Sequence, residues 1–255
     1  MKRSLESIAF MFSQLTKRDF RKKYQRSVLG IFWSVLSPVL TMLVMRLMFT
    51  QFFGHDIAFY TTYILAGNIV FAYFREATSE GMNTVMANAR ILSKLDVPKT
   101  LFLYSKNVAM FVNFAISVGV FFVFCIFDGI TFGFHMLMLL FPILCMFVFC
   151  TGMSMLLASM YVFFKDIRYL WNVFLRLLMY MSAVFYRIDG YPEIYQKLFM
   201  LNPVYVYILY FRTVSIDGAV PSLLIHGLCI GYALIAMVLG YTVFKRNEKR
   251  FIFYF

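Results

Sequence analysis

The chain has 255 residues, of which 62% are hydrophobic and 14% are charged, and its mean hydropathy is +0.77. Soluble domains carry about 45–50% apolar and about 25% charged residues, so this composition excludes an ordinary soluble fold and favours a single membrane domain. The formal net charge of +12 does not indicate nucleic-acid binding, because the basic residues lie between apolar runs and form no groove with interleaved polar readers.

The N-terminal segment, residues 1–27, combines an amphipathic pattern with a basic cluster between Lys17 and Arg26. Its apolar residues recur at helical spacing at Leu5, Ile8, Ala9 and Phe12. The segment is too charged for the h-region of a signal peptide, so we expect the mature chain to start at Met1. The pattern predicts an amphipathic helix in the inner membrane interface, with a simple basic anchor as the alternative.

Residues 28–255 contain six apolar stretches long enough to cross a hydrocarbon core of about 30 Å, which takes about 20 residues. They are Val28–Phe53, Ile57–Phe74, Val108–Phe127, His135–Phe164, Ile167–Tyr186 and Val220–Phe244. The fourth exceeds one crossing, so we expect it to tilt, to break near Pro142 or Gly152, or to project into the cytoplasm. The sequence therefore predicts an all-α polytopic membrane protein with six transmembrane helices.

The distribution of Lys and Arg predicts the orientation of these helices. Basic residues cluster before the first stretch and again after the last, at Lys245, Arg246, Lys249 and Arg250. The connections at residues 54–56 and 128–133 carry neither Lys nor Arg. Because cytoplasmic loops carry the excess of these residues, six crossings place both termini in the cytoplasm.

The connection after the second stretch, residues 80–100, is the most informative polar segment. We expect a short helix at about residues 88–96, with Asn88 as its N-cap and Pro98 at the start of the next helix. It would present four residues to the cytoplasm, where a moving partner could push on it: Arg90, Ile91, Ser93 and Lys94. A solvated inner loop is the alternative interpretation.

Between the fifth and sixth stretches lie two apolar runs that are too short to span, Ile194–Leu201 and Val204–Phe211. They suit two re-entrant helices, over about residues 190–213, that dip into the outer leaflet and cover the outer mouth of a pore. Asn202 precedes Pro203, and the residue before proline avoids the helical region. We therefore expect the break between the two helices at this position.

Aromatic residues make up 20% of the chain. Sugar rings stack on aromatic faces and Tyr hydroxyls exchange hydrogen bonds with sugar hydroxyls, which would give the weak multi-site binding that conduction requires. Interfacial belts and helix packing are the alternative. The candidates for a substrate pathway are Arg26, Trp33, Tyr63, Phe71, Phe74, Arg176, Tyr186, Tyr205 and Tyr207.

Arginines within the apolar stretches need an explanation, because intramembrane charges are costly. Arg75 lies beside Glu76 and Glu80, where pairing or snorkelling accounts for it. Arg176 lies in the middle of the fifth stretch without an acidic neighbour at helical spacing. Our hypothesis is that Arg176 faces the interior of a dimer or contacts a lipid pyrophosphate, with a purely structural role as the alternative.

Motifs for metal binding and catalysis are weak. The four cysteines lie in apolar runs without a CxxC pair, the three histidines are scattered, and no G-x-x-x-x-G-K-[ST] phosphate loop occurs. Energy for transport must then come from a partner or a gradient. Two functions predict further patterns: an ion-coupled secondary transporter predicts intramembrane carboxylates and an internal repeat, and a glycan-processing membrane enzyme needs acidic or histidine constellations.

Five motifs in this order resemble the type-2 ABC transporter permeases, and most closely those that export lipid-linked O-antigen, capsule or teichoic-acid polymers. They are RKKYQRSVLGIFWSVLSPVL (Arg21–Leu40), YILAGNIVFAYF (Tyr63–Phe74), NARILSKLDVP (Asn88–Pro98), FKDIRYLW (Phe164–Trp171) and LNPVYVYILYFR (Leu201–Arg212). The family usually has Arg-Asp after the fourth span, and this chain has Lys165-Asp166. The positive charge is kept at this position, but lysine cannot form the two parallel hydrogen bonds that arginine forms with a carboxylate.

The resemblance implies a homodimer in the cytoplasmic (inner) membrane that binds two copies of a separate ABC nucleotide-binding subunit. ATP and Mg²⁺ would bind to that ATPase, so no enzymatic activity or cofactor is expected on this chain. The coupling helix would consist of Arg90, Ile91, Leu92, Ser93 and Lys94. The segment Tyr191–Arg212 would be the outer gate, and a lipid-linked glycan would enter near Arg26 and Trp33.

Overall fold

The structure is a computed structural model, and it describes residues 5–24, 29–30, 32–53, 59–94 and 97–254. Within these ranges the regular structure is entirely helical, which confirms the predicted all-α class. The elements are α1 (Leu5–Tyr24), α2 (Phe32–Phe53), α3 (Tyr60–Ala87), α4 (Ala89–Leu92), α5 (Lys99–Phe127), the 3₁₀ helix η1 (Phe134–Leu139), α6 (Leu140–Phe163), α7 (Ile167–Met181), α8 (Glu193–Phe199), α9 (Pro203–Ser215), α10 (Leu223–Asn247) and the 3₁₀ helix η2 (Phe251–Tyr254).

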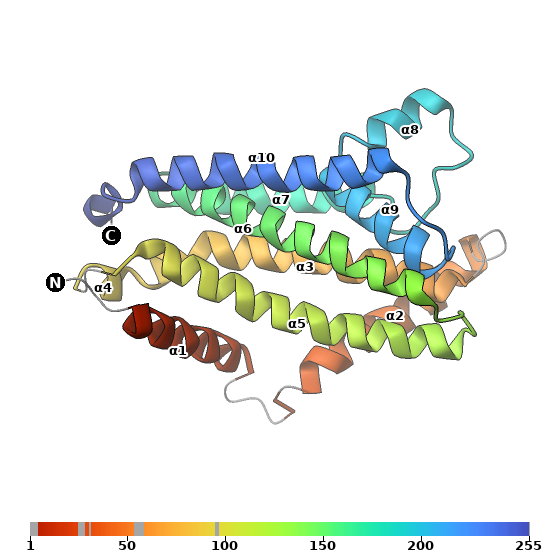
Figure 1. Cartoon of the computed structure of the whole chain (residues 1–255), viewed down its shortest axis with the longest axis horizontal. Helices are drawn as coiled ribbons and strands as arrows, with labels where there is room; N and C mark the ends of the chain where they lie inside the picture. The colour runs from red at the N-terminus through yellow and green to blue at the C-terminus, as the bar shows by residue number, and fades with distance from the viewer. Residues whose placement is uncertain (1–4, 25–28, 31, 54–58, 95–96, 255) are drawn as a thin grey trace.

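Four long helices form the body of the molecule. Helices α3, α5, α6 and α10 extend along its longest axis, with α6 packed between α3 and α10 (Figure 1). Helix α1 lies along the outside of α5. Helix α4 and η2 lie at one end of the bundle, where α1 also begins, whereas α8 projects at the opposite end. The two described ends of the chain therefore share one end of the bundle.

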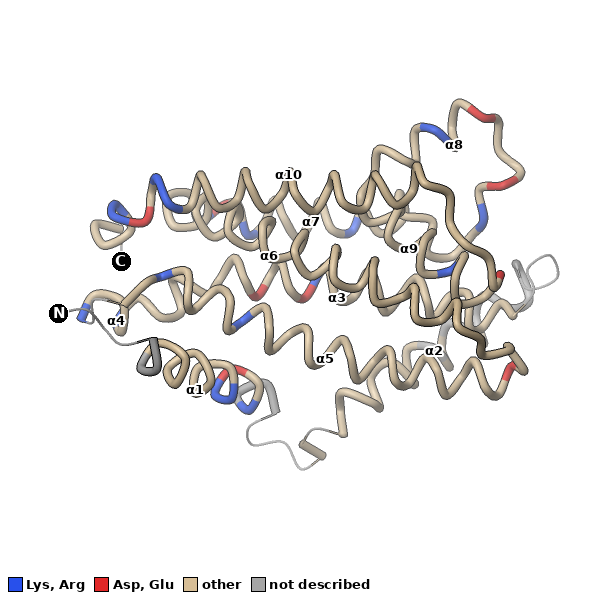
Figure 2. Tube along the Cα trace, in the orientation of Figure 1, with Lys and Arg blue, Asp and Glu red and all other residues tan. Residues whose placement is uncertain are grey.

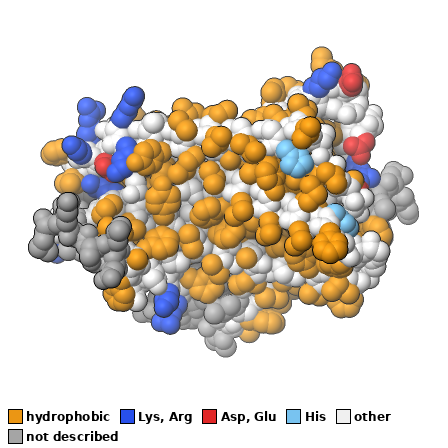
Figure 3. Space-filling view, viewed as in Figure 1, with side chains coloured by type: hydrophobic (Ala, Val, Ile, Leu, Met, Phe, Trp, Pro, Cys, Tyr) orange, Lys and Arg blue, Asp and Glu red, His pale blue; other side chains and the backbone are white. Residues whose placement is uncertain are grey.

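Among the residues that the structure describes, three helical segments are long and apolar enough to cross a membrane by length and composition: Lys99–Phe127, Phe134–Phe163 and Leu223–Asn247. Figure 2 shows Lys and Arg clustered where η2 ends the chain, and hydrophobic side chains cover the middle of the face in Figure 3. This arrangement fits a membrane protein. The expected total of six crossings stays a prediction.

The fourth apolar stretch changes from a 3₁₀ helix to an α-helix near Pro142, one of the two positions where we expected a break, but the helix is not interrupted there. Its first residues form η1, and α6 begins at Leu140, so that Pro142 lies in the first turn of α6. Proline is tolerated there because the first-turn N–H groups have no intrahelical acceptor. Helix α6 continues through Gly152, where a Cβ on Gly240 of α10 would collide with the Gly152 carbonyl. Small residues thus allow two backbones to approach closely, as is common between membrane helices.

The buried apolar residues of the described segments form two clusters. The larger one fills the space among α3, α5, α6, α7, α9 and α10. The smaller one, which we call the end cluster, joins α1, α3, α4, α5, α6, α10 and η2 at the α4 end. It consists of Leu15, Val85, Leu92, Val97, Leu101, Phe102, Leu103, Met155, Ala158, Val162, Phe244 and Phe251. The end cluster therefore fixes α4 to the ends of the long helices.

Candidate functional site

The segment expected to form a coupling helix is shorter than predicted. Helix α4 is a single turn, Ala89–Leu92, and Ser93 and Lys94 follow in a turn, while residues 95–96 lie outside the described residues. Leu92 is 4% exposed and packs into the end cluster, whereas Ile91 is 37% exposed. Arg90, Ser93 and Lys94 are also exposed. One apolar residue therefore anchors this turn, and its neighbours face outward.

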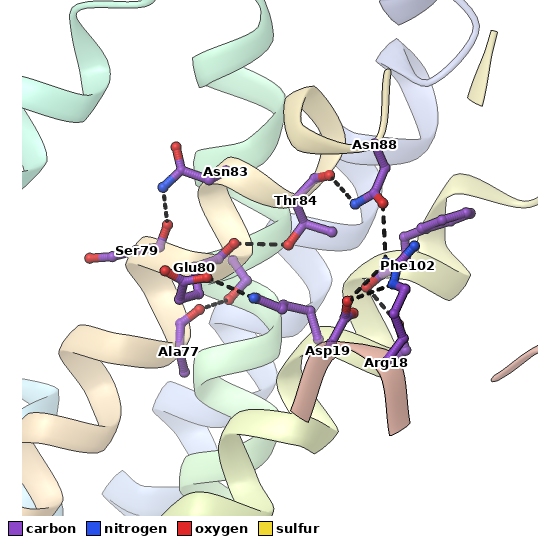
Figure 4. A network of polar contacts seen from close by, with 12 residues as sticks. Arg18, Asp19, Ala77, Ser79, Glu80, Asn83, Thr84, Asn88 and Phe102 are labelled. Atoms are coloured by element: carbon purple, nitrogen blue, oxygen red, sulfur yellow. Dashed lines mark hydrogen bonds and ion pairs between the residues drawn. The ribbon is translucent and has the colours of Figure 1, made fainter. Parts of the chain in front are cut away.

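Asn88 is the N-cap residue of α4, as predicted, but its side chain makes no capping hydrogen bond to this helix. Its Nδ2 donates to the Thr84 carbonyl at 2.8 Å, and its Oδ1 accepts from Nη2 of Arg18 at 3.1 Å (Figure 4). The amide links α1 to the end of α3 and is not available to the first turn of α4. The position of Pro98, directly before α5, is confirmed.

Glu80 has a different partner from the expected one. Among the described residues, Oε2 of Glu80 forms an ion pair with Nζ of Lys106 on α5, at a distance of 2.7 Å. The side chain of Arg75 is exposed. The sequence left pairing and snorkelling open for Arg75, and its exposed side chain fits snorkelling. Glu76 is in contact with Asn113 of α5, whose Nδ2 lies 3.3 Å from Oε2 of Glu76.

At the opposite end of the bundle, the two short helices α8 and α9 separate at Asn202, which was the predicted break. The Oδ1 of Asn202 accepts from the backbone N–H of Val204 at 3.0 Å and of Tyr205 at 3.4 Å, as an N-cap does. Its Nδ2 donates to the Met181 carbonyl at 3.0 Å. The same side chain thus starts α9 and binds the end of α7.

Arg212 is a buried arginine that sequence reasoning noticed only as the last residue of a motif. It is 4% exposed, and its Nη1 and Nη2 donate to the carbonyls of Ala183 and Val184 at 2.8 and 2.6 Å. Its Nε and Nη2 donate to the Tyr63 carbonyl at 3.2 and 3.1 Å. The sequence did contain a signal for this site: Arg212 directly follows the apolar run Val204–Phe211 in α9. A cation rarely enters such a run without partners.

Three predicted pathway tyrosines, Tyr63, Tyr186 and Tyr205, surround a small cavity of about 60 Å³ beside Arg212. Arg187 lies at the same cavity and forms ion pairs with Asp217 at 3.1 Å and with Asp189 at 3.7 Å. The Tyr63 hydroxyl donates to the Tyr186 carbonyl at 2.9 Å. The structure therefore gathers aromatic rings, hydroxyls and charges at the end of the bundle that carries α8.

The other predicted pathway residues that the structure describes are not among the lining residues of this cavity. Phe71, Phe74 and Tyr207 are buried in the larger cluster, which fits the packing interpretation left open by the sequence. The ring of Phe74 lies 5.8 Å from that of Phe149, and the Tyr207 hydroxyl donates to the Cys229 carbonyl at 2.8 Å. Trp33 on α2 and Arg176 on α7 are exposed. Arg26, and the side chain of Arg46, lie outside the described residues.

Comparison with known proteins places this architecture in a family. Residues 11–215 match the model of the ABC-2 type transporter family. The O-antigen export system permease protein RfbA of Klebsiella pneumoniae is 24% identical over 253 residues, which cover 98% of this chain and 97% of the relative. The relative of the same name in Myxococcus xanthus is 22% identical and covers 86% of this chain and 85% of its own length.

A capsule export protein is similar over most of the chain as well. The capsule polysaccharide export inner-membrane protein CtrC of Neisseria meningitidis serogroup A is 22% identical, over 92% of this chain and 90% of the relative. The family match extends from α1 to the end of α9, and so includes α4, the buried Arg212 and the Asn202 break. The chain belongs to the ABC-2 type transporter family.

Proposed function

We propose that this chain is the membrane permease subunit of an ATP-driven exporter that moves a lipid-linked polysaccharide across the cytoplasmic membrane. The observation that carries the proposal is the similarity, over nearly the whole chain, to relatives named for O-antigen and capsule export. The apolar helical bundle supports a transport role. Neither rival, the ion-coupled transporter or the glycan-processing enzyme, has support among these relatives.

In the proposed topology six segments cross the bilayer and both termini lie in the cytoplasm. The shared position of α4, η2 and the start of α1 at one end of the bundle supports it. The basic residues in the last turn of α10, Lys245 and Arg246, then lie on the cytoplasmic side, where Lys and Arg are in excess. Helices α8 and α9 lie toward the outer side and serve as the gate, with Tyr63, Tyr186 and Tyr205 near the exit.

The turn around Ile91 is the proposed contact with the ATPase. Arg90, Ser93 and Lys94 offer polar and charged groups, and Ile91 offers an apolar one that is partly exposed. Leu92 holds this turn in the end cluster, which also contains Leu15 of α1 and Phe251 of η2. A push on α4 would therefore reach α1, α5, α6 and α10 together, because packed interiors transmit displacement.

A second copy of the chain is the proposed partner for α7. Trp171, Leu175 and Leu178 are the buried residues of this helix, and the exposed ones include several large apolar side chains: Tyr169, Leu170, Val173, Phe174, Leu177 and Tyr180. Lipid could cover such a face, but the exposed Arg176 would then stand in hydrocarbon at a cost of several kcal/mol. A homodimer with Arg176 toward its interior avoids that cost.

Co-purification and export assays test the proposal. The tagged chain is expressed with the ABC nucleotide-binding subunits of the same organism, and the recovered complex is assayed for ATP hydrolysis and for dimers of the permease. We expect one kind of ATPase subunit to be retained, in as many copies as the permease. Export of the polymer should require both proteins. Transport or glycan processing by the chain alone would contradict the proposed function.

The contact itself is tested with substitutions in the coupling turn. Ile91→Asp should abolish retention of the ATPase because it places a charge in the apolar part of the contact, and Glu193→Gln, an exposed change on α8, serves as the matched control. Loss of retention in both variants, or in neither, would remove α4 from the interface.

A further inference from the structure

Helix α7 ends at Met181, although the sequence after it favours more helix. The next residues, Ser182–Tyr186, contain neither glycine nor proline, and the apolar stretch that predicted this helix continues to Tyr186. Alanine is the best helix former, yet Ala183 has a φ of 49°, in the left-handed region. Helices often end on one left-handed residue, but glycine or asparagine usually occupies it, because a Cβ strains this conformation. Contacts from elsewhere in the chain must therefore stop α7.

Side chains of the α9 segment bind backbone carbonyls that a longer α7 would need. In a continued helix each carbonyl accepts from the N–H group four residues further along. In the structure, Nδ2 of Asn202 donates to the Met181 carbonyl at 3.0 Å. Nη1 and Nη2 of Arg212 donate to the carbonyls of Ala183 and Val184 at 2.8 and 2.6 Å. These two side chains therefore compete with backbone N–H groups for the same acceptors.

Tyrosine hydroxyls bind three more carbonyls of the same connection. The Tyr186 hydroxyl donates to the Tyr180 carbonyl at 2.7 Å, and a continued α7 would use this acceptor as well. Tyr60, at the start of α3, donates to the Phe185 carbonyl at 3.2 Å. Tyr63, one turn further along α3, donates to the Tyr186 carbonyl at 2.9 Å. The connection after α7 is thus held by side chains of α3 and α9, so its conformation depends on where those helices lie.

We propose that residues 182–186 form a switch that winds onto α7 as an additional helical turn when the contacts from the α9 segment are released. The same carbonyls would then accept from backbone N–H groups, and Ala183 would leave the left-handed region. Five residues span about 7.5 Å in a helix and up to about 17 Å in an extended chain, so winding them shortens the connection and α8 has to follow. This inference concerns the conformation of the chain and does not depend on what the protein transports.

Hydrogen exchange of the full chain in detergent, measured by mass spectrometry, tests the switch with the variant Asn202→Asp. An ionised aspartate can still accept from the first N–H groups of α9, as Asn202 does, but it cannot donate to the Met181 carbonyl. We expect the backbone amides of residues 184–186 to exchange about tenfold more slowly in this variant, because they become bonded within α7. Asn83→Asp is the matched control. It removes a donor to the Ser79 carbonyl within α3 and should leave those amides unchanged.

The direction of the change separates a switch from a contact that only stabilises the connection. Without a switch, loss of the Asn202 donor loosens the connection, and its amides exchange faster. Faster or unchanged exchange in Asn202→Asp would therefore overturn the proposal. If that variant does not fold, Tyr186→Phe tests the same point, because it removes the donor to the Tyr180 carbonyl and keeps the ring.

The substitution Ala183→Gly should act against the switch. Glycine tolerates the left-handed conformation and weakens a helix, so the slower exchange of Asn202→Asp should disappear in the double variant. Alone, Ala183→Gly should leave the melting temperature unchanged or raise it. Ala115→Gly, at an exposed position within α5, should lower it. An equal decrease in both single variants would show that Ala183 is not strained, and this result would also overturn the proposal.

Discussion

The guanidinium carbon of Arg212 lies 3.5 Å from the centroid of the Tyr63 ring, while the same guanidinium donates to the Tyr63 backbone carbonyl. Its remaining bonds reach the carbonyls of Ala183 and Val184, just after α7. One side chain of α9 therefore binds the start of α3 and the connection that leads to α8. The ring contact adds a cation–π attraction, which is worth most where water is excluded.

Loss of this guanidinium should destabilise the protein strongly. Arg212→Leu leaves the buried carbonyls of Ala183 and Val184 without the donor that the structure gives them, and each buried group left unsatisfied costs about 1–3 kcal/mol, so we expect a loss of about 2 kcal/mol or more. Arg212→Lys should recover only part of it, because one ammonium cannot reproduce the planar fork. Thermal unfolding in detergent measures both. Arg187→Gln, which removes exposed ion pairs, is the control, and an equal midpoint for Arg212→Leu and Arg187→Gln would contradict the prediction.

Gly67 leaves the space that Arg212 occupies. A Cβ at this position would collide with Nη2 of Arg212, whereas a Cβ on Gly119 of α5 would meet no atom within 4 Å. Gly67→Ala should therefore lower the unfolding temperature, and Gly119→Ala should leave it unchanged or raise it, since alanine favours a helix over glycine by about 0.5–1 kcal/mol. In a double-mutant cycle, the cost of Gly67→Ala should largely disappear in the Arg212→Leu background. Simple additivity of the two changes would show that the collision is not their cause.

The sequence predicted where helices begin and break better than it predicted which side chains of different helices are in contact. The break at Asn202 and the helix start after Pro98 were correct because proline acts on its own neighbours. Asn88 is the N-cap residue of α4 as predicted, but its side chain does not cap the helix, because its amide has partners on α1 and one turn back on α3, and the first of these depends on tertiary packing. Helix α7 ends at Met181, five residues before the predicted end of its apolar stretch, where Ser182 and Ala183 turn the chain.

The candidate site shows the same limit. Tyr63, Tyr186 and Tyr205 were chosen for their chemistry and do lie together, but Phe71, Phe74 and Tyr207, chosen on the same grounds, are packed in the core. Composition cannot separate these two groups, because an aromatic ring suits both a binding surface and a helix interface. The Lys106–Glu80 pair and the role of Arg212 join residues that are distant in sequence, so neither follows from a local pattern.

Helices α6 and α10 should be sensitive to a single methyl group at their crossing. A Cβ on Gly240 would collide with the Gly152 backbone, but one on Gly231 of the same helix would have open space. Gly240→Ala should reduce thermal stability and the yield of folded protein, because both backbones would have to separate. Gly231→Ala is the matched control within α10. If the two substitutions changed the melting temperature alike, the close crossing would not exist in the folded protein.

Leu92 and Ile91 are adjacent, and their substitutions should have different effects. Leu92→Ala opens a cavity in the end cluster, and such changes cost about 2–5 kcal/mol, so the melting temperature should fall. Ile91→Ala removes a partly exposed side chain, so it should leave the melting temperature nearly unchanged and weaken retention of the ATPase. Thermal unfolding and co-purification separate the two effects. A large loss of stability for Ile91→Ala would show that the residue packs internally.

Arg176 and Arg168 offer a comparison within one helix. Both are exposed on α7, but Arg168 lies in its first turn, where a long side chain can reach the membrane surface, and Arg176 lies two turns further along. If Arg176 faces the interior of a dimer, Arg176→Leu should reduce dimer recovery and polymer export several-fold without lowering the stability of the single chain, and Arg168→Leu should change neither. Cross-linking, export assays and thermal unfolding measure these three quantities. Normal assembly together with normal export in Arg176→Leu would remove this residue from the pathway and leave lipid as the cover of that face.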